Sequence, residues 1–254
     1  MGLKEIYMPS VALGLARAGF ASLAFDYRGF GESEGPRYRL IPSEQIEDIQ
    51  NALSYVETRD DVRADMLMLW GTSLGGSHAL TVAATDSRVR CVVANTPAAN
   101  LARQVQRRPS DELSQFWRDI ANDRRERALT GRSKVVSPLF ILPYDDDSQR
   151  AYQESLAKYP ERRKMLFPLE TVDRFLGYMP ERFVDLISPR PLLLISAEFD
   201  MLTPPNEQRA LFERALAPKR LEIINGATHY TAYTSPFFDQ IIGLSVAFYE
   251  DSIT

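Results

Sequence analysis

Short apolar segments alternate with amphipathic stretches along much of this chain. The apolar segments are flanked by polar or turn-forming residues, which is typical of buried strands, and they cover residues 21–25, 66–70, 89–94, 191–200 and 221–224. Apolar residues recur at helical spacing between them, in residues 11–19, 43–56, 74–84, 205–216 and 236–249. Strands that alternate with helices through short links favour right-handed crossovers and a parallel sheet. Ser43 is the predicted N-cap of the second helix.

The alternation stops between residues 98 and 186. This stretch is polar and rich in arginine, with helical segments but no convincing strand. An insert of this size between two sheet strands is usually a helical cap over the strand ends. We therefore predict an α/β fold, a mostly parallel doubly wound sheet built from residues 1–97 and 187–254, with a helical cap formed by residues 98–186.

Composition narrows the function classes. Among 254 residues, 30 are basic and 34 acidic, which gives a net charge of -4 and no basic footprint for nucleic acid. No run of about 18 apolar residues occurs, so no transmembrane helix and no membrane partner is predicted. Cys91 is the single cysteine and cannot form an internal disulfide, which fits a reducing compartment and a cytoplasmic location.

A G-x-S-x-G motif lies between a predicted strand and a predicted helix. Residues 70–76 read WGTSLGG. In this context the glycines leave room for a strained turn that lifts the Ser73 hydroxyl above the sheet. The following helix N-terminus stabilises negative charge, and the backbone N–H of Leu74 points toward a developing oxyanion. We predict Ser73 as a catalytic nucleophile and Leu74 as an oxyanion donor.

A nucleophilic serine needs a base, and the chain has only two histidines. His78 lies in the helix after Ser73, where it would point away from the hydroxyl, so we interpret it as a packed core histidine. His229 follows the predicted strand 221–224 in the loop NGATHY. Catalytic residues of open α/β sheets collect in loops at strand ends. His229 is therefore the predicted base.

An acidic residue is expected to orient that imidazole. Asp200 ends the apolar segment LLLIS-AEFD and gives the chain order Ser, Asp, His. Its alternative role is a helix cap, and Glu198, two residues upstream, is the fallback acid. Asp26 also ends a predicted strand, but it precedes the serine and its loop has the character of a structural turn.

Together these residues resemble the α/β-hydrolase fold over nearly the whole chain. The resemblance rests on the loop DYRGFGESEG, the turn GTSLGG, and the pair EFDMLTPP and GATHY. The less specific segments GLKEIYMPSVA and RLIPSEQIEDIQNAL resemble the branch of polyketide transferases and thiohydrolases, which approaches the X-Pro dipeptidyl-peptidase and acetyl-esterase-like groups. The resemblance implies a serine hydrolase without a metal or other cofactor.

Members of that branch carry a His-Gly dipeptide just upstream of a segment like GLKEIYMP, and the loop after it supplies a second oxyanion donor. The chain begins inside that loop, so we expect that early strands are missing and that Gly2 is the last residue of the loop. On this expectation the 254-residue chain is less soluble and less active than a version extended upstream.

The predicted activity is cleavage of an ester or thioester of a small or medium acyl substrate through Ser73, His229 and Asp200. Two alternatives stay open: an acyltransferase or polyketide-releasing thiohydrolase, and a catalytically weak hydrolase-like binding protein. The predicted partner is a small-molecule acyl substrate, and a homodimer is left open.

Two features of the insert allow more than one interpretation. Its arginine runs suggest a patch for an anionic ligand, although solvated helix faces explain them better. Its aromatic residues would line an acyl pocket or form the cap's own core; these are Phe116, Trp117, Phe167, Phe175, Leu176 and Tyr178.

Overall fold

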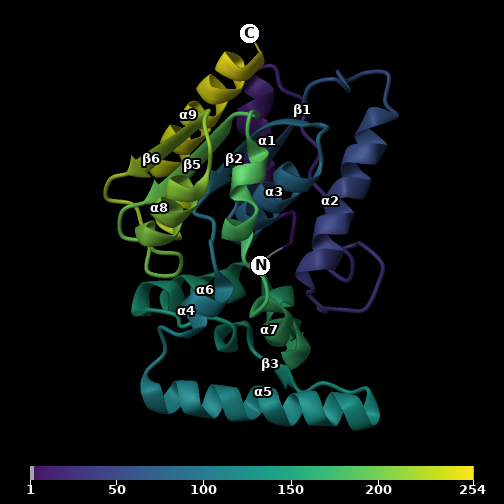
Figure 1. Cartoon of the computed structure of the whole chain (residues 1–254), viewed down its shortest axis with the longest axis vertical. Coiled ribbons are helices and arrows are strands. Elements are labelled where there is room, and N and C mark those ends of the chain that lie inside the picture. Colours follow the sequence, from purple (N-terminus) through teal and green to yellow (C-terminus); the bar gives the residue numbers. More distant parts are fainter. Residues whose placement is uncertain (1–2, 254) are drawn as a thin grey trace.

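The computed structural model describes residues 3–253, apart from the side chain of Glu161. Four strands form one parallel sheet, as predicted (Figure 1). In spatial order they are β1 (Leu67–Thr72), β2 (Val89–Asn95), β5 (Leu192–Ala197) and β6 (Lys219–Ile224). Because all four run the same way, their carboxyl ends lie at one edge of the sheet, where α/β proteins place their sites.

The sheet is covered on both faces because side chains alternate along each strand. In β2, Val92 and Ala94 pack in one apolar cluster, whereas Cys91 and Val93 pack in another. The first cluster includes residues of α2 (Pro42–Glu57), α3 (Leu74–Thr85) and α8 (Pro205–Arg214). The second includes residues of α1 (Met8–Arg17) and α9 (Phe237–Ile253). The doubly wound α/β architecture predicted from the alternation is confirmed.

Helix termini follow local chemistry. The first helix ends just before Gly19, which has a φ of 88°, a conformation that glycine adopts without steric cost. The predicted cap of the second helix is wrong: Ile41 is the N-cap of α2, and Pro42 is already helical. The φ angle of proline is already close to the helical value. Its missing N–H costs nothing at the first helical position, because an amide there would have no partner within the helix. The helix therefore begins one residue earlier than expected.

The predicted strand at residues 21–25 is also wrong. This segment has no regular secondary structure and pairs with no strand of the described chain, and Leu23 is 49% exposed. Residues 20–25 and β1 line one cavity of about 720 Å³. In the described chain no hydrogen-bond ladder joins residues 21–25 to a neighbour, and an apolar segment becomes a strand only where a partner strand supplies that ladder.

This difference predicts a contrast in hydrogen exchange. The amide hydrogens of residues 22–24 should exchange at least about a hundredfold faster than those of Val92–Ala94, because only the latter lie in a central strand. Exchange measured by mass spectrometry on peptides from both segments checks this. Equal protection of the two segments would mean that residues 21–25 are paired in solution.

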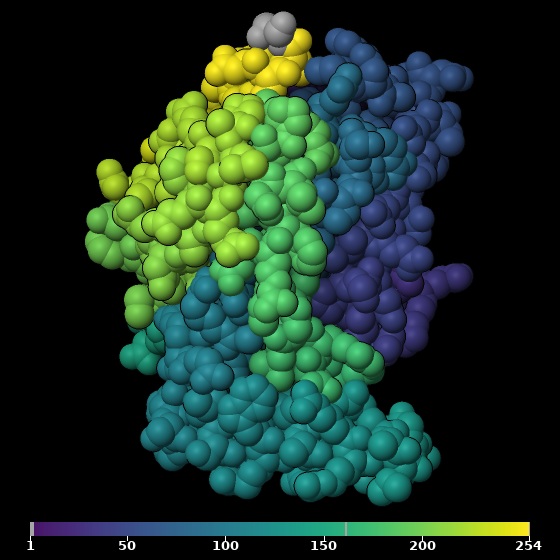
Figure 2. All heavy atoms as spheres, viewed as in Figure 1, coloured from purple at the N-terminus to yellow at the C-terminus, as the bar shows by residue number. Residues whose placement is uncertain are grey.

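The insert at residues 98–186 is mainly helical. Its helices are α4 (Leu101–Val105), α5 (Ser110–Thr130), α6 (Asp146–Lys158) and α7 (Leu169–Phe175), and its short 3-10 turns are η1 (Pro138–Phe140), η2 (Pro160–Lys164), η3 (Pro180–Arg182) and η4 (Val184–Ile187), the last of which ends at residue 187. We expected no strand in this insert, and in one detail this expectation is wrong. Two short strands, β3 (Val135–Val136) and β4 (Phe167–Pro168), form an antiparallel pair. In Figures 1 and 2 the teal insert forms a layer at one end of the molecule, with α5 farthest from the sheet.

Four aromatic residues of the insert are buried in one apolar cluster, and two of them, Phe167 and Phe175, also line the cavity beside β1. Phe116, Phe167, Phe175 and Tyr178 are buried together with Phe30 and Leu40, which lie outside the insert. Trp117 is 38% exposed, so it is not part of a closed pocket. This packing attaches the insert to the loop DYRGFGESEG, because Phe30 belongs to that loop.

Several of the insert's arginines have acidic partners, whereas Arg107 and Arg108 donate to the backbone carbonyls of Met201 and Phe140. Arg103 bonds to Glu181 and Glu207, and Arg127 bonds to Asp123 and Asp173. These pairs favour the interpretation of balanced helix faces over an anionic-ligand patch. No helix in the described residues combines the length and apolarity that a bilayer crossing requires.

Candidate active site

Ser73 lies at the turn between β1 and α3. Its backbone has φ 54° and ψ -125°, a conformation that a non-glycine residue adopts only where the surroundings enforce it. Its amide donates to the Asn95 carbonyl at 2.9 Å, which fixes the turn to β2. A Cβ at Gly71 would collide with the Gly75 carbonyl oxygen. Gly71 therefore serves as the sequence pattern predicts, by allowing strand and helix to approach closely, whereas a Cβ at Gly75 would meet nothing within 4 Å.

Asp200 and His229 are brought together by two adjacent strands. Asp200 follows β5, His229 follows β6, and the carboxylate Oδ2 lies 2.6 Å from imidazole Nδ1. Asp200 is fully buried, and its Oδ1 accepts the backbone amides of Leu202 at 2.8 Å and Thr203 at 2.7 Å. A carboxylate that only accepts hydrogen bonds fixes the imidazole with its hydrogen on Nδ1 and a free lone pair on Nε2.

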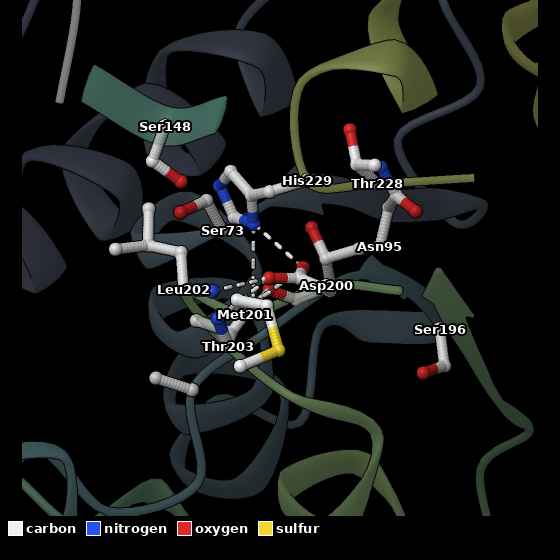
Figure 3. A network of polar contacts seen from close by, with 12 residues as sticks. Ser73, Asn95, Ser148, Ser196, Asp200, Met201, Leu202, Thr203, Thr228 and His229 are labelled. Carbon is white, nitrogen blue, oxygen red and sulfur yellow. Dashed lines mark hydrogen bonds and ion pairs between the residues drawn. The ribbon is translucent and has the colours of Figure 1, made fainter. Parts of the chain in front are cut away.

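Figure 3 shows the Ser73 hydroxyl on the side of the imidazole that carries the second nitrogen. Among the described residues no hydrogen bond joins the two groups, an arrangement common in ligand-free sites whose contacts tighten when substrate binds. Leu74 is the first residue of α3, so its amide has no acceptor within the helix. Donor, hydroxyl and imidazole thus occupy the same edge of the sheet.

His78 is separate from this group. It is fully buried, with Nδ1 2.8 Å from the Tyr178 hydroxyl and Nε2 2.9 Å from Gln45 Oε1. Burial lowers the pKa of His78 to about 3, so the imidazole stays neutral. Its environment fits the core histidine that we expected.

The two other candidate acids hold loops in place. Glu198 is exposed and accepts the Gly226 amide at 2.8 Å, across the loop that leads to His229. Asp26 is buried and accepts the Lys4 amide and ammonium, each at 2.8 Å. Asp26 therefore closes a structural turn, in line with its sequence context.

One acidic group among the described residues brings its oxygens close enough for a metal ion: Glu5, Asp26 and Glu32. The Lys4 ammonium lies among them, 2.8 Å from both Asp26 and Glu32. Because the lysine already supplies positive charge there, the group is an ion-pair cluster. Asp145, in the acidic run of the insert, accepts the Ser148 amide as the N-cap of α6.

The cavity beside β1 extends to the candidate site. Its wall includes Ser73 and His229 from the sheet edge, and Tyr144, Tyr152 and Met165 from the insert. The insert therefore forms part of the wall of this cavity. Gly2, which we expected to end an oxyanion loop, lies outside the described residues.

Sequence reasoning missed two residues at the site. Thr203 donates its hydroxyl to Asp200 Oδ2 at 2.9 Å, and Tyr233 packs against the His229 ring with centroids 6.2 Å apart. Thr203 had a signal, because a threonine three residues after an aspartate commonly closes a local turn. No sequence signal pointed to Tyr233, because the residues that it contacts, such as Tyr7 and Thr72, come from distant parts of the chain.

Comparison with known proteins identifies the family. The family described as serine aminopeptidase, S33, matches residues 5–233. The chain is 38% identical over 251 residues to quorum-quenching protein AidA of Acinetobacter baumannii, covering 95% of this chain and 80% of that protein. It is 25% identical over 266 residues to thiohydrolase aneE of Aspergillus aculeatus, covering 98% of this chain and 82% of that protein.

Solved structures agree on the fold. The structure of the DcsB complex with its substrate analogue matches with a TM-score of 0.86 at 20% identity, over 99% of this chain and 87% of that chain. The expected resemblance to α/β hydrolases, including relatives named as thiohydrolases, is confirmed. The chain therefore belongs to the serine aminopeptidase S33 family and is an α/β-hydrolase enzyme.

Proposed function

We propose that this enzyme cleaves esters or thioesters of small or medium acyl groups through a covalent intermediate on Ser73. One observation carries the proposal: a buried Asp200–His229 hydrogen bond of 2.6 Å stands beside a serine held in a strained strand-to-helix turn. Such a constellation is recognised by geometry and roles, and both parts are costly to maintain without a chemical use.

In the proposed reaction, Ser73 Oγ attacks the substrate carbonyl carbon while His229 Nε2 takes the hydroxyl proton. The Leu74 amide donates to the resulting oxyanion. Collapse breaks the bond to the leaving alcohol or thiol, which receives the proton from His229. Water, activated by the same imidazole, then attacks the acyl-enzyme and releases the acid. Asp200 stabilises the imidazolium in both halves.

The cavity supports the proposed substrate class. Apolar side chains from the core and from the insert line the same cavity as Ser73, among them Leu74, Leu101, Leu142, Met165 and Leu202. We propose that residues 98–186 act as a cap whose inner surface contacts the acyl chain. The names of relatives, a thiohydrolase among them, are compatible with acyl chemistry of this kind.

The two alternatives share the same structure and differ in outcome. An acyltransferase would form the same acyl-enzyme and pass the acyl group to an alcohol instead of water. A binding protein would hold the acyl compound without forming the covalent intermediate. No contact described above favours either one over hydrolysis.

Product analysis distinguishes these functions. Incubation with p-nitrophenyl butyrate and with a butyryl thioester should release butyric acid from both, with a p-nitrophenol burst of about one equivalent per enzyme if deacylation is slow. Added acceptor alcohols that divert most of the acyl group into a new ester would instead show a transferase. If the wild-type enzyme releases p-nitrophenol no faster than the Ser73→Ala variant, both the hydrolase and the transferase are contradicted. The binding protein is then the remaining function.

A further inference from the structure

We propose that Tyr233 is a positioning residue that holds the His229 loop against the serine turn through its hydroxyl bond to Thr72. The inference rests on the proposed function, because it concerns how the base reaches the nucleophile. We call Tyr7, Thr72 and Tyr233 the tyrosine tether.

The tether joins the residue before the nucleophile to the loop of the base. Thr72 ends β1 next to Ser73, and Tyr233 ends the short turn η5 (Thr231–Tyr233), four residues after His229. The Thr72 Oγ1 and Tyr233 Oη atoms are 2.8 Å apart. Asn95 Nδ2 donates to the same threonine oxygen at 3.1 Å, so the threonine hydrogen is available to donate to Tyr233.

The ring of Tyr233 is held on two sides. It stacks on Tyr7 with centroids 4.1 Å apart and an interplanar angle of 16°. On another side it meets the His229 ring at 6.2 Å and 71°, an edge-to-face arrangement. A ring fixed in this way transmits the position of its hydroxyl to the neighbouring imidazole.

The sheet order explains why such a contact matters. Ser73 follows β1 and His229 follows β6, and β2 and β5 lie between these strands. Asp200 and Thr203 both contact the imidazole at Nδ1, at 2.6 Å and 3.3 Å, but contacts at that one nitrogen do not fix the direction in which Nε2 points. The Thr72–Tyr233 bond links the β6 loop directly to the strand of the nucleophile. Misplacement of reacting groups by about 1 Å can cost about a hundredfold in rate.

The test compares two variants that both remove the Thr72–Tyr233 bond, of which Thr72→Val also removes the bond that Thr72 accepts from Asn95. Tyr233→Phe and Thr72→Val should each lower kcat about tenfold, with KM within about twofold of wild type, because binding surfaces are kept while the geometry of attack loosens. The rate of Ser73 labelling by a fluorophosphonate probe should fall by the same factor. The double variant should be no slower than Thr72→Val alone, since Tyr233→Phe removes only an interaction that Thr72→Val has already removed. Thr72→Ser keeps a hydroxyl and should restore most of the rate.

A matched control separates positioning from stability. The Tyr249 hydroxyl donates to the Leu69 carbonyl, in the same strand β1, at 2.9 Å. Tyr249→Phe should lower the melting temperature about as much as Tyr233→Phe while leaving kcat unchanged. Wild-type kcat in Tyr233→Phe, or an equal loss of kcat in Tyr249→Phe, would overturn the inference. Additive losses in the double variant would overturn it as well.

The same experiments keep this inference apart from the proposed function. If Ser73→Ala is still labelled by the probe, the proposed nucleophile is wrong. If Ser73→Ala is not labelled while Tyr233→Phe is labelled at the wild-type rate, Ser73 is supported as the nucleophile. In that case only the positioning role of Tyr233 is contradicted.

Discussion

Ser73→Ala is expected to lower kcat/KM for p-nitrophenyl butyrate by about 10⁵–10⁶-fold and to abolish labelling by a fluorophosphonate probe. The reason is that every step of the proposed reaction passes through a covalent bond to Ser73 Oγ. The variant should fold normally, because the strained turn is held by the Ser73 backbone amide and by the close approach of Gly71 to Gly75, not by the hydroxyl. Labelled-peptide mass spectrometry and a melting curve measure both effects.

Ser114→Ala is a suitable control for this experiment. Ser114 is exposed on α5, where its hydroxyl bonds only to the Ser110 carbonyl, so the substitution removes the same group far from the sheet. Activity and labelling should equal wild type. Labelling that persists in Ser73→Ala would place the nucleophile elsewhere and remove the basis of the proposed mechanism.

Asp200→Asn is expected to lower kcat by about 10⁴-fold. The hydrogen-bond pattern explains the size of the effect. Because Oδ1 accepts two backbone amides, from Leu202 and Thr203, an asparagine amide nitrogen is excluded from that position and must replace Oδ2. There it would donate to His229 Nδ1, which forces the imidazole hydrogen onto Nε2. An imidazole in that tautomer cannot take the proton from Ser73.

Glu198→Gln tests whether the acid is assigned correctly. Glu198 is two residues away but exposed, and the amide of glutamine still accepts the Gly226 N–H, so kcat should stay within about twofold of wild type. Steady-state kinetics and a melting curve for both variants decide the matter. A large loss in Glu198→Gln together with a small one in Asp200→Asn would reverse the assignment.

The fold was predictable where the pattern of the sequence matched a local physical need. Strands close to residues 67–72, 89–95 and 192–197 were predicted because buried parallel strands are short and apolar on both faces, whereas the strand at 219–224 was predicted only from residue 221 onward. The segment at 21–25 has the same composition and failed, because a strand exists only through a partner and none of the described chain pairs with it. The short pair β3–β4 was missed because two residues carry too little pattern.

The site was predictable for a similar reason. Ser73 is marked by glycines that the turn requires, and the shortage of histidines left His229 as the candidate base. Asp200 could be proposed from its place at a strand end, but Glu198 stayed open because sequence spacing does not say which carboxylate faces the imidazole. In the structure, Asp200 lies against His229 and Glu198 faces solvent. The roles of these residues stay predictions until the variants above are measured.

The sequence by itself determined the alternation of strands and helices, the tight turn at Ser73 and the membership in an α/β architecture, since each depends on residues close along the chain. Only the tertiary structure decided which groups meet: Asp200 with His229, Tyr233 with Thr72, and the insert with the wall of the cavity. These contacts join residues from separate strands and loops, and their distances depend on the packing of the whole sheet. Periodicity and composition describe the surroundings that a side chain needs, whereas its actual partner is selected by the fold.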